Sequence, residues 1–195
     1  MVMFLGEVAN WRWGLKQPEE WGKRETAGPS NKLLSNVDFK AQLKLEEQDI
    51  VRESVGVMDP ILELRAKGDM FPTVWYGFDV QCTAVRHFRL AQLRLTAEDP
   101  NLEIASRAAH RKAEAQVRSI VMNLCGIAIH HLKVQPCMMN AVIAISLYGD
   151  YFTDQGERNA LIGIINRTKD IHAWPMRKPY QTLLQRWEIA DNVEL

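Results

Sequence analysis

Apolar side chains recur every three or four residues through most of this chain, and that spacing predicts helices. The longest such run extends from about Asn101 to His131, where small alanines precede large aliphatic residues. At a rise of 1.5 Å per residue, a helix of that length spans roughly 45 Å. Residues three and four apart share one helix face, so each predicted helix has an apolar face for another helix to cover. No convincing strand alternation is found, and the sequence therefore predicts an all-α fold.

Capping residues, glycines and prolines divide this pattern into an irregular array of about six or seven packed helices. Thr153 is the predicted N-cap of the sixth helix. Pro175 suits the first turn of the last helix, where the N–H that it lacks is not needed. Trp174 and Trp187 are expected to anchor that last helix, and Gly126 to mark a close approach or a kink. The predicted ranges are about 36–54, 60–68, 73–95, 101–131, 136–149, 153–173 and 175–187.

The helix predicted over 73–95 combines an apolar stripe with a basic exterior. Four residues spaced by four, three and three positions are expected to be buried: Phe78, Cys82, Val85 and Phe88. Four basic residues lie mostly off that stripe and are expected to face solvent: Arg86, His87, Arg89 and Arg94. This predicts a helix with one covered face.

Residues 1–35 show no sustained period and are predicted to form an irregular arm, followed by a helical domain over 36–195. The arm contains Trp11 and Trp13, whereas disordered segments are poor in aromatic residues. We therefore expect the arm to dock on the body of the domain or on a partner, with these two tryptophans as candidate contacts. Docking on a neighbouring subunit of an obligate oligomer is a further alternative.

Length and charge exclude several classes of protein. The chain has 195 residues, 47% of them hydrophobic, which suits one domain with a substantial core. Its 24 basic and 24 acidic residues leave a formal net charge of zero, so direct nucleic-acid binding is not expected. Three cysteines without CxxC spacing favour an intracellular location, nucleus or cytoplasm. No apolar run approaches the roughly 20 residues of a membrane span.

Candidate chemistry is sparse, and we expect neither a metal, a cofactor nor catalysis. His130 and His131 are adjacent, so on a helix they diverge by about 100° and cannot readily share one metal. Cys137 would be a nucleophile if its helix N-terminus lowered its pKa, but no oriented base is identifiable. Cys82 and Cys125 are expected to be inert core thiols, and no phosphate-binding or nucleophile-elbow motif occurs. The alternative is a small helical enzyme or ligand-binding protein with a pocket near Cys125, His130, His131 and Cys137.

Four segments in sequence order resemble the C-terminal part of fungal zinc-cluster transcription factors. They are an aromatic and arginine-containing helix (76–89), a long helix ending near a cysteine (111–125), a Thr-Asp-Gln helix start (153–155), and a Trp-Pro corner with a final tryptophan (174–187). The resemblance covers about residues 73–188. It implies an all-helical regulatory region that acts through intramolecular contacts, partner proteins or small effectors.

One departure from that family limits what the resemblance implies. Such factors also hold two zinc ions in a cluster of six cysteines, with pairs spaced CxxC. The three scattered cysteines of this chain cannot build that cluster. The resemblance therefore implies transcription regulation through a protein partner or small effector, without direct nucleic-acid contact by this chain, and it assigns no residue a role.

Overall fold

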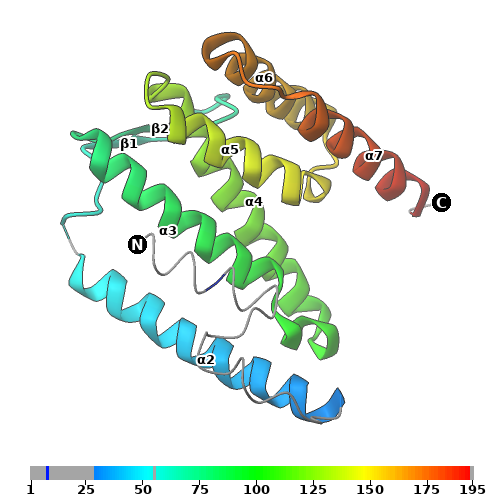
Figure 1. Ribbon diagram of the computed structural model, residues 1–195. Coiled ribbons are helices and arrows are strands. Elements are labelled where there is room, and N and C mark those ends of the chain that lie inside the picture. Colours follow the sequence, from blue (N-terminus) through cyan, green and yellow to red (C-terminus); the bar gives the residue numbers. More distant parts are fainter. Residues whose placement is uncertain (1–7, 9–28, 55, 194–195) are drawn as a thin grey trace.

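Six α-helices and a two-stranded sheet form the regular structure of the described residues (Figure 1). This computed structural model describes residue 8 and residues 29–54 and 56–193. The predicted all-α array is confirmed, because the sheet contains only two three-residue strands. The helices are α2 (Pro29–Glu53), α3 (Asp79–Ala97), α4 (Arg107–His130), α5 (Gln135–Tyr148), α6 (Gln155–His172) and α7 (Arg177–Val193). The strands are β1 (Leu62–Leu64) and β2 (Thr73–Trp75), and the short 3-10 helices are η2 (Pro100–Ile104) and η3 (Gly149–Tyr151).

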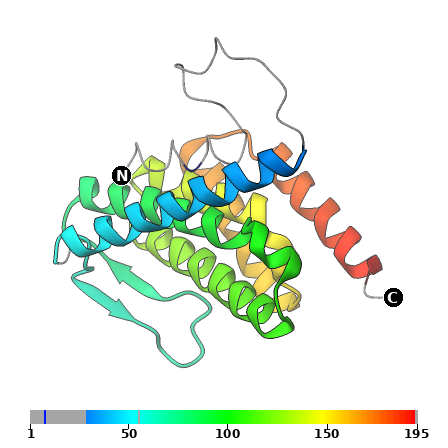
Figure 2. The same ribbon diagram turned by 90° about the horizontal axis from the view of Figure 1, so that it is seen from below.

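Helices α3, α4 and α5 pack against one another at the centre of the molecule. Helix α2 lies along the outer side of α3, while α6 and α7 cover α5 from the opposite side (Figure 1). The main core lies between α4, α5, α6 and α7 and includes the fully buried Leu124, Ile145, Phe152 and Leu161. The end of α7 extends beyond the other helices (Figure 2). None of the described helices combines the length and apolar character needed to cross a bilayer.

Several helices begin at other residues than predicted. Helix α2 begins at Pro29, seven residues before Asn36, because proline fits the first helical turn. Asp154, not Thr153, caps α6, since its side chain accepts a hydrogen bond from the N–H of Glu157. The predicted 101–131 helix is divided, because Asp99 caps the separate turn η2 and Ser106 then caps α4. Helix α7 begins at Arg177, two residues after Pro175.

The arm predicted over 1–35 falls mostly on residues 1–7 and 9–28, which lie outside the described part of the chain, as do Trp11 and Trp13. Val8 is described, and it lies fully buried with Leu43 of α2 and Phe88 of α3. Val8 therefore packs against the body of the domain. Residues 29–35, which were assigned to the arm, belong to α2.

The sequence prediction is wrong for residues 60–68, which do not form a helix, and for the start of the 73–95 helix. These segments form an antiparallel hairpin in which Leu62 pairs with Trp75 and Leu64 with Thr73. Threonine, valine and tryptophan in β2 favour an extended backbone, and three-residue strands are too short to show alternation. Gly68 adopts the left-handed φ of +103° in the connection between the strands.

Gly126 lies where the hairpin meets α4. A Cβ atom placed there would collide with the carbonyl oxygen of Pro72, the residue before β2. Val74 of β2 is fully buried next to this point of contact. The close approach predicted at Gly126 is therefore confirmed, and glycine allows the hairpin to dock on the helix.

The stripe predicted on α3 is right for Cys82, Val85 and Phe88, which are buried, but wrong for Phe78, which is 76% exposed. Phe78 precedes the helix as its N-cap residue and therefore does not share the buried face. The prediction that the basic residues of this helix face solvent is also partly wrong, because Arg86 and Arg94 are buried. Helices α2, α4 and α5 all contact α3, so residues beside the apolar stripe are covered as well.

The last helix is docked largely as predicted. Leu183 and Trp187 of α7 are buried, and the indole Nε1 of Trp187 donates a hydrogen bond of 2.8 Å to the carbonyl oxygen of Gly149. Trp174 does not anchor the helix, since it is 39% exposed beside Ala173, whose left-handed φ of +52° ends α6. Of the two tryptophans, only Trp187 therefore anchors α7, together with Leu183.

Candidate functional site

Two cysteines that are far apart in the sequence meet in a small buried cluster. Their Sγ atoms lie 3.1 Å apart, although the residues are 55 positions apart. Cys82 is in the first turn of α3 and Cys137 in the first turn of α5, and both are fully buried. Val74 of β2, Val85 of α3, Ile127 of α4 and Tyr76, the residue after β2, surround them. We call Cys82, Cys137 and the neighbouring Arg86 the thiol cluster.

Arg86 is fully buried beside the two thiols. Its Nη2 donates a hydrogen bond to the carbonyl oxygen of Pro136, while Nε and Nη1 have no hydrogen-bond partner within the described part of the chain. Burying a guanidinium costs free energy unless an opposite charge compensates it. The neighbouring Cys137 sulfur can supply such a charge, because Arg86 contributes to the lowered pKa of that thiol; at Cys82 the same effect of Arg86 is outweighed.

The pKa values of the two thiols are shifted in opposite directions. The pKa of Cys137 lies below its ordinary value, chiefly because the Cys82 thiol hydrogen-bonds to it and secondarily because of Arg86, while burial and Asp79 oppose the shift. The same sulfur–sulfur hydrogen bond, together with burial, raises the pKa of Cys82. This arrangement favours a thiolate on Cys137 and a protonated thiol on Cys82, which donates to it.

His130 and His131 lie at the end of α4, as predicted, and both contact one aromatic ring. The Trp75 ring centroid is 5.7 Å from that of His130 and 5.8 Å from that of His131. Nε2 of His131 accepts a hydrogen bond of 3.2 Å from the backbone N–H of Tyr76. The histidine pair therefore packs against the end of β2, and among the described residues no group of three metal-ligating side chains forms.

His131 is expected to titrate below its ordinary pKa of 6.5, because burial disfavours the charged imidazolium. A pKa lowered in the folded state means that the unfolded chain binds the proton first as the pH falls. His131 therefore contributes stability above pH 6.5 that is lost as the pH falls toward its folded pKa. An NMR titration of the imidazole resonances checks this. A midpoint at or above 6.5 would contradict the neutral acceptor role of Nε2.

The structure does not bring together all four residues of the suggested pocket, Cys125, His130, His131 and Cys137, because Cys125 and Cys137 lie in different buried clusters. Cys125 is fully buried among the apolar residues of the main core, where burial raises its pKa, and it does not belong to the thiol cluster. Cys82 and Arg86 are the residues that sequence reasoning missed. No local sequence pattern indicates the cluster, because Cys82 and Cys137 are 55 residues apart and only the packing of helices brings them together.

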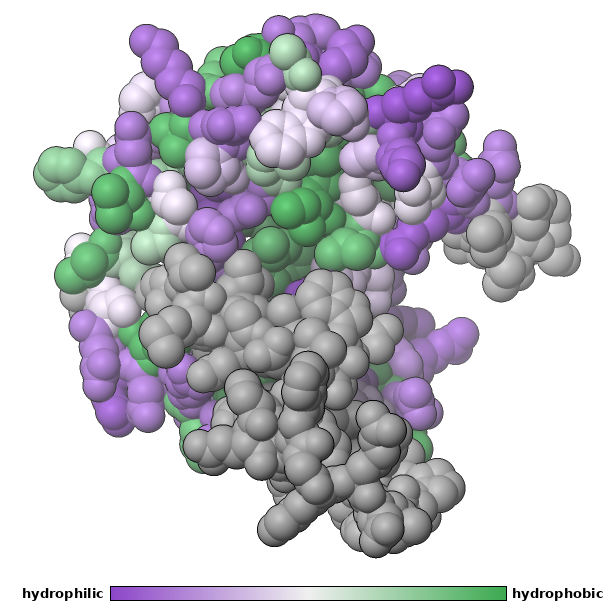
Figure 3. Space-filling model, in the orientation of Figure 1, coloured by the Kyte–Doolittle hydropathy of each residue, from purple (hydrophilic) through white to green (hydrophobic). Residues whose placement is uncertain are grey.

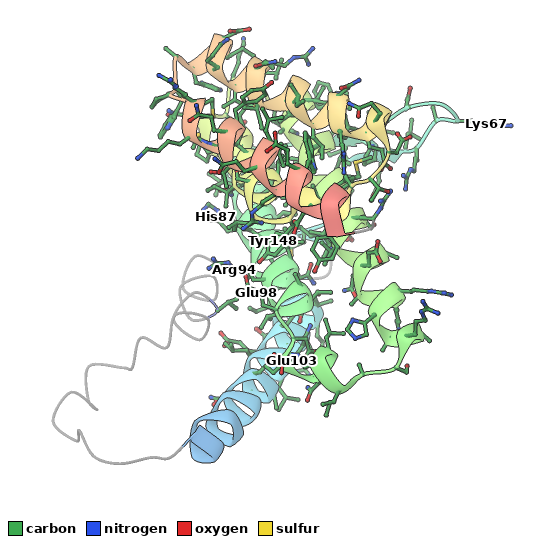
Figure 4. The ribbon with its side chains drawn as sticks, turned by 90° about the vertical axis from the view of Figure 1, so that its right-hand side faces the viewer. Lys67, His87, Arg94, Glu98, Glu103 and Tyr148 are labelled. Carbon is green, nitrogen blue, oxygen red and sulfur yellow. The ribbon has the colours of Figure 1, made fainter. Side chains whose placement is uncertain are left out.

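A second buried polar group joins the ends of α3 and α5. The Tyr148 hydroxyl donates a hydrogen bond of 2.6 Å to Oε1 of Glu98, and Arg94 lies beside them (Figure 4). Burial, followed by the hydrogen bond to the Glu98 carboxylate, raises the pKa of Tyr148. The hydrogen bond between Tyr148 and Glu98 thus connects the ends of two core helices and stabilises their packing.

Replacing Tyr148 by Phe is expected to lower the free energy of unfolding by about 1.5 kcal/mol, because a half-buried carboxylate loses a hydrogen-bond donor. Chemical denaturation of Tyr148→Phe, Glu98→Gln and the double variant measures it. If Tyr148 and Glu98 act through this bond, the double variant loses less than the sum of the single changes. Strict additivity would show that the bond contributes nothing.

Most of the large apolar side chains that are exposed on the described part of the chain lie on the hairpin or on the segments directly before and after it, between residues 57 and 80. Eight of them, between 36% and 80% exposed, are Val57, Ile61, Leu62, Leu64, Met70, Trp75, Phe78 and Val80, which we call the hairpin surface. The hairpin extends from the side of the helical bundle (Figure 2), and Lys67 at its tip points away from the body (Figure 4). Hydrophobic side chains also follow the left edge of the molecule, where the α2–β1 connection and the hairpin run (Figure 3).

Comparison with protein-family models gives no match, and comparisons with the curated proteins and with the solved structures give no significant match. The resemblance to fungal zinc-cluster transcription factors therefore stays a prediction.

Proposed function

We propose that this protein is a helical interaction module that binds a protein partner through the hairpin surface, and that it is not an enzyme. The observation that carries the proposal is the exposure of eight large apolar side chains within residues 57–80. Exposed apolar groups that gather in one place mark binding sites more often than ordinary surface does. Two of the eight, Trp75 and Phe78, are of the aromatic type that is enriched at the centres of protein interfaces.

The geometry of the hairpin favours a partner with an extended apolar segment. Strand β1 pairs only with β2 in the described residues, so its outer edge is open for a further strand. An added strand hydrogen-bonds through its main chain and places alternate side chains on the apolar faces. Charges along the hairpin balance, because Glu63 and Asp69 offset Arg65 and Lys67. Apolar contact and strand pairing, not charge attraction, therefore provide the affinity.

The regulatory role implied by the fungal resemblance is compatible with such a module. Regulation would consist of binding or releasing the partner in the nucleus or cytoplasm, and a small effector is the other ligand class that the resemblance implies. The zero formal net charge argues against direct DNA contact. The resemblance adds a biological setting, whereas the exposed hairpin carries the proposal.

A displayed library of random peptides, selected against the purified protein, tests the binding surface. We expect enrichment of peptides with alternating apolar residues, and loss of their binding when Leu64, Phe78 and Val80 are all replaced by Ser. The matched control replaces three exposed apolar residues elsewhere, Leu45, Ile104 and Ile171, by Ser, and should bind normally. Failure to enrich any peptide, or equal binding by both triple variants, would contradict the proposal.

A further inference from the structure

We propose that the thiol cluster is an oxidation site for hydroperoxides, in which Cys137 is the reacting thiolate and Cys82 the resolving thiol. Hydrogen peroxide would convert the two residues into an intramolecular disulfide between α3 and α5. This goes beyond the interaction module and does not depend on partner binding by the hairpin.

The distance between the sulfur atoms is the first argument. At 3.1 Å they are within about 1 Å of the S–S bond length of roughly 2.05 Å. Each thiol lies in the first turn of its helix, and the preceding residues Gln81 and Pro136 are exposed or lie at the edge of the buried region. A small shift of either helix start is therefore sufficient to bring the sulfur atoms to bonding distance, without rearrangement of the main core.

The charges around Cys137 are the second argument, because a thiolate, not a thiol, attacks a peroxide. The fully buried Arg86 has two nitrogens without a hydrogen-bond partner in the residues described, and it lies against both sulfur atoms. Cys137 is also the third residue of α5, where the positive end of the helix dipole favours an anion. Asp79 is the nearby group that opposes the negative charge. A thiolate on Cys137 compensates the buried guanidinium.

The chemistry balances in two steps. The Cys137 thiolate attacks one peroxide oxygen, the O–O bond breaks, and the departing hydroxide takes up a proton to give water and a sulfenic acid on Cys137. The Cys82 sulfur then attacks the Cys137 sulfur, the S–S bond forms and the S–O bond breaks. Hydroxide leaves with the proton of Cys82 as a second water. Two thiols are oxidised by two electrons, and one peroxide is reduced.

Burial restricts the oxidant to small, uncharged molecules. Both sulfur atoms lie behind side chains of β2, α3 and α4, and both cysteines are 0% exposed. Hydrogen peroxide is similar in size to water, whereas glutathione disulfide is large and charged. We therefore expect oxidation by hydrogen peroxide and little reaction with glutathione disulfide in the folded protein.

Alkylation and mass spectrometry of the reduced full chain after peroxide treatment test the proposal. Before treatment, three thiols are alkylated under denaturing conditions; afterwards one is, and it maps to Cys125. Peptide mapping should show a Cys82–Cys137 link, and circular dichroism should show that the helices persist. Three free thiols after peroxide treatment, or a link that includes Cys125, would overturn the proposal.

Single replacements by serine distinguish the two roles. In Cys82→Ser, peroxide should convert Cys137 to a sulfenic acid at least about tenfold faster than Cys125, because the thiolate fraction sets the rate of attack on peroxide. Dimedone added together with denaturant then traps the sulfenic acid of either buried residue for quantification. In Cys137→Ser, Cys82 should react no faster than Cys125. Cys125→Ser is the matched control and should form the disulfide as the natural chain does. Equal labelling of Cys82 and Cys137 in the two variants would refute the assigned roles. The disulfide map of the unaltered chain decides the proposal independently if a variant fails to fold.

Discussion

Replacing Trp187 by Ala is expected to lower the free energy of unfolding by about 3 to 5 kcal/mol, the cost of removing a large buried aromatic side chain. Trp187 is 5% exposed on α7 and belongs to the main core. Its Nε1 donates a hydrogen bond to Gly149, and the Arg158 guanidinium lies 5.1 Å from the ring centroid. The change therefore removes apolar burial, a hydrogen bond and a cation–π contact together.

Trp174→Ala is the matched control for that experiment. It makes the same substitution 13 positions earlier, at a tryptophan that is 39% exposed. We expect a loss of less than about 1 kcal/mol there, as is usual for surface positions. Urea denaturation followed by circular dichroism measures both variants. A loss below about 1 kcal/mol for Trp187→Ala would show that α7 is not docked through this residue.

Gly126→Ala is expected to destabilise the protein by about 2 to 3 kcal/mol, although alanine is the better helix former. An added Cβ atom would collide with the carbonyl oxygen of Pro72 and lie 3.0 Å from the Cγ of the same residue. A backbone carbonyl cannot rotate away as a side chain does, so the hairpin must move off α4. Val74, now fully buried, would then lose part of its cover.

Gly163→Ala provides the opposite control on α6. A Cβ atom at Gly163 meets nothing within 4 Å, so the substitution should stabilise the protein by about 0.5 to 1 kcal/mol through helix propensity. The same substitution is thus expected to lower the free energy of unfolding at position 126 and to raise it at position 163. Thermal unfolding measures both. Stabilisation by Gly126→Ala would show that α4 and the hairpin do not approach as closely as described.

Elements with a long periodic pattern of apolar residues could be predicted from the sequence, whereas very short elements could not. Helix α5 was predicted within a residue or two, because Pro136 and Gly149 delimit a mostly apolar run. The hairpin was missed because each strand has only three residues, too few for a periodicity. The apolar residues of segment 60–68, taken as a helix face, are exposed on the hairpin.

The candidate site could be predicted only in part. Cys137 was recognised as a possible nucleophile from its place at a helix start, and the structure adds the causes of its lowered pKa. Arg86 was assigned to the solvent side of α3 because its position lies off the apolar stripe. It is buried because α3 is contacted by helices on several sides, which the period of one helix does not reveal.

The sequence by itself determined that this chain is helical, where most of its helices end, and that Trp187 faces the core, since these follow from the spacing of neighbouring residues. Tertiary structure alone decided that Cys82 meets Cys137 beside a buried arginine, and that Gly126 is where the hairpin docks. The physical reason is that local spacing specifies which face of a helix is apolar. Only packing between helices specifies which residues of two faces touch.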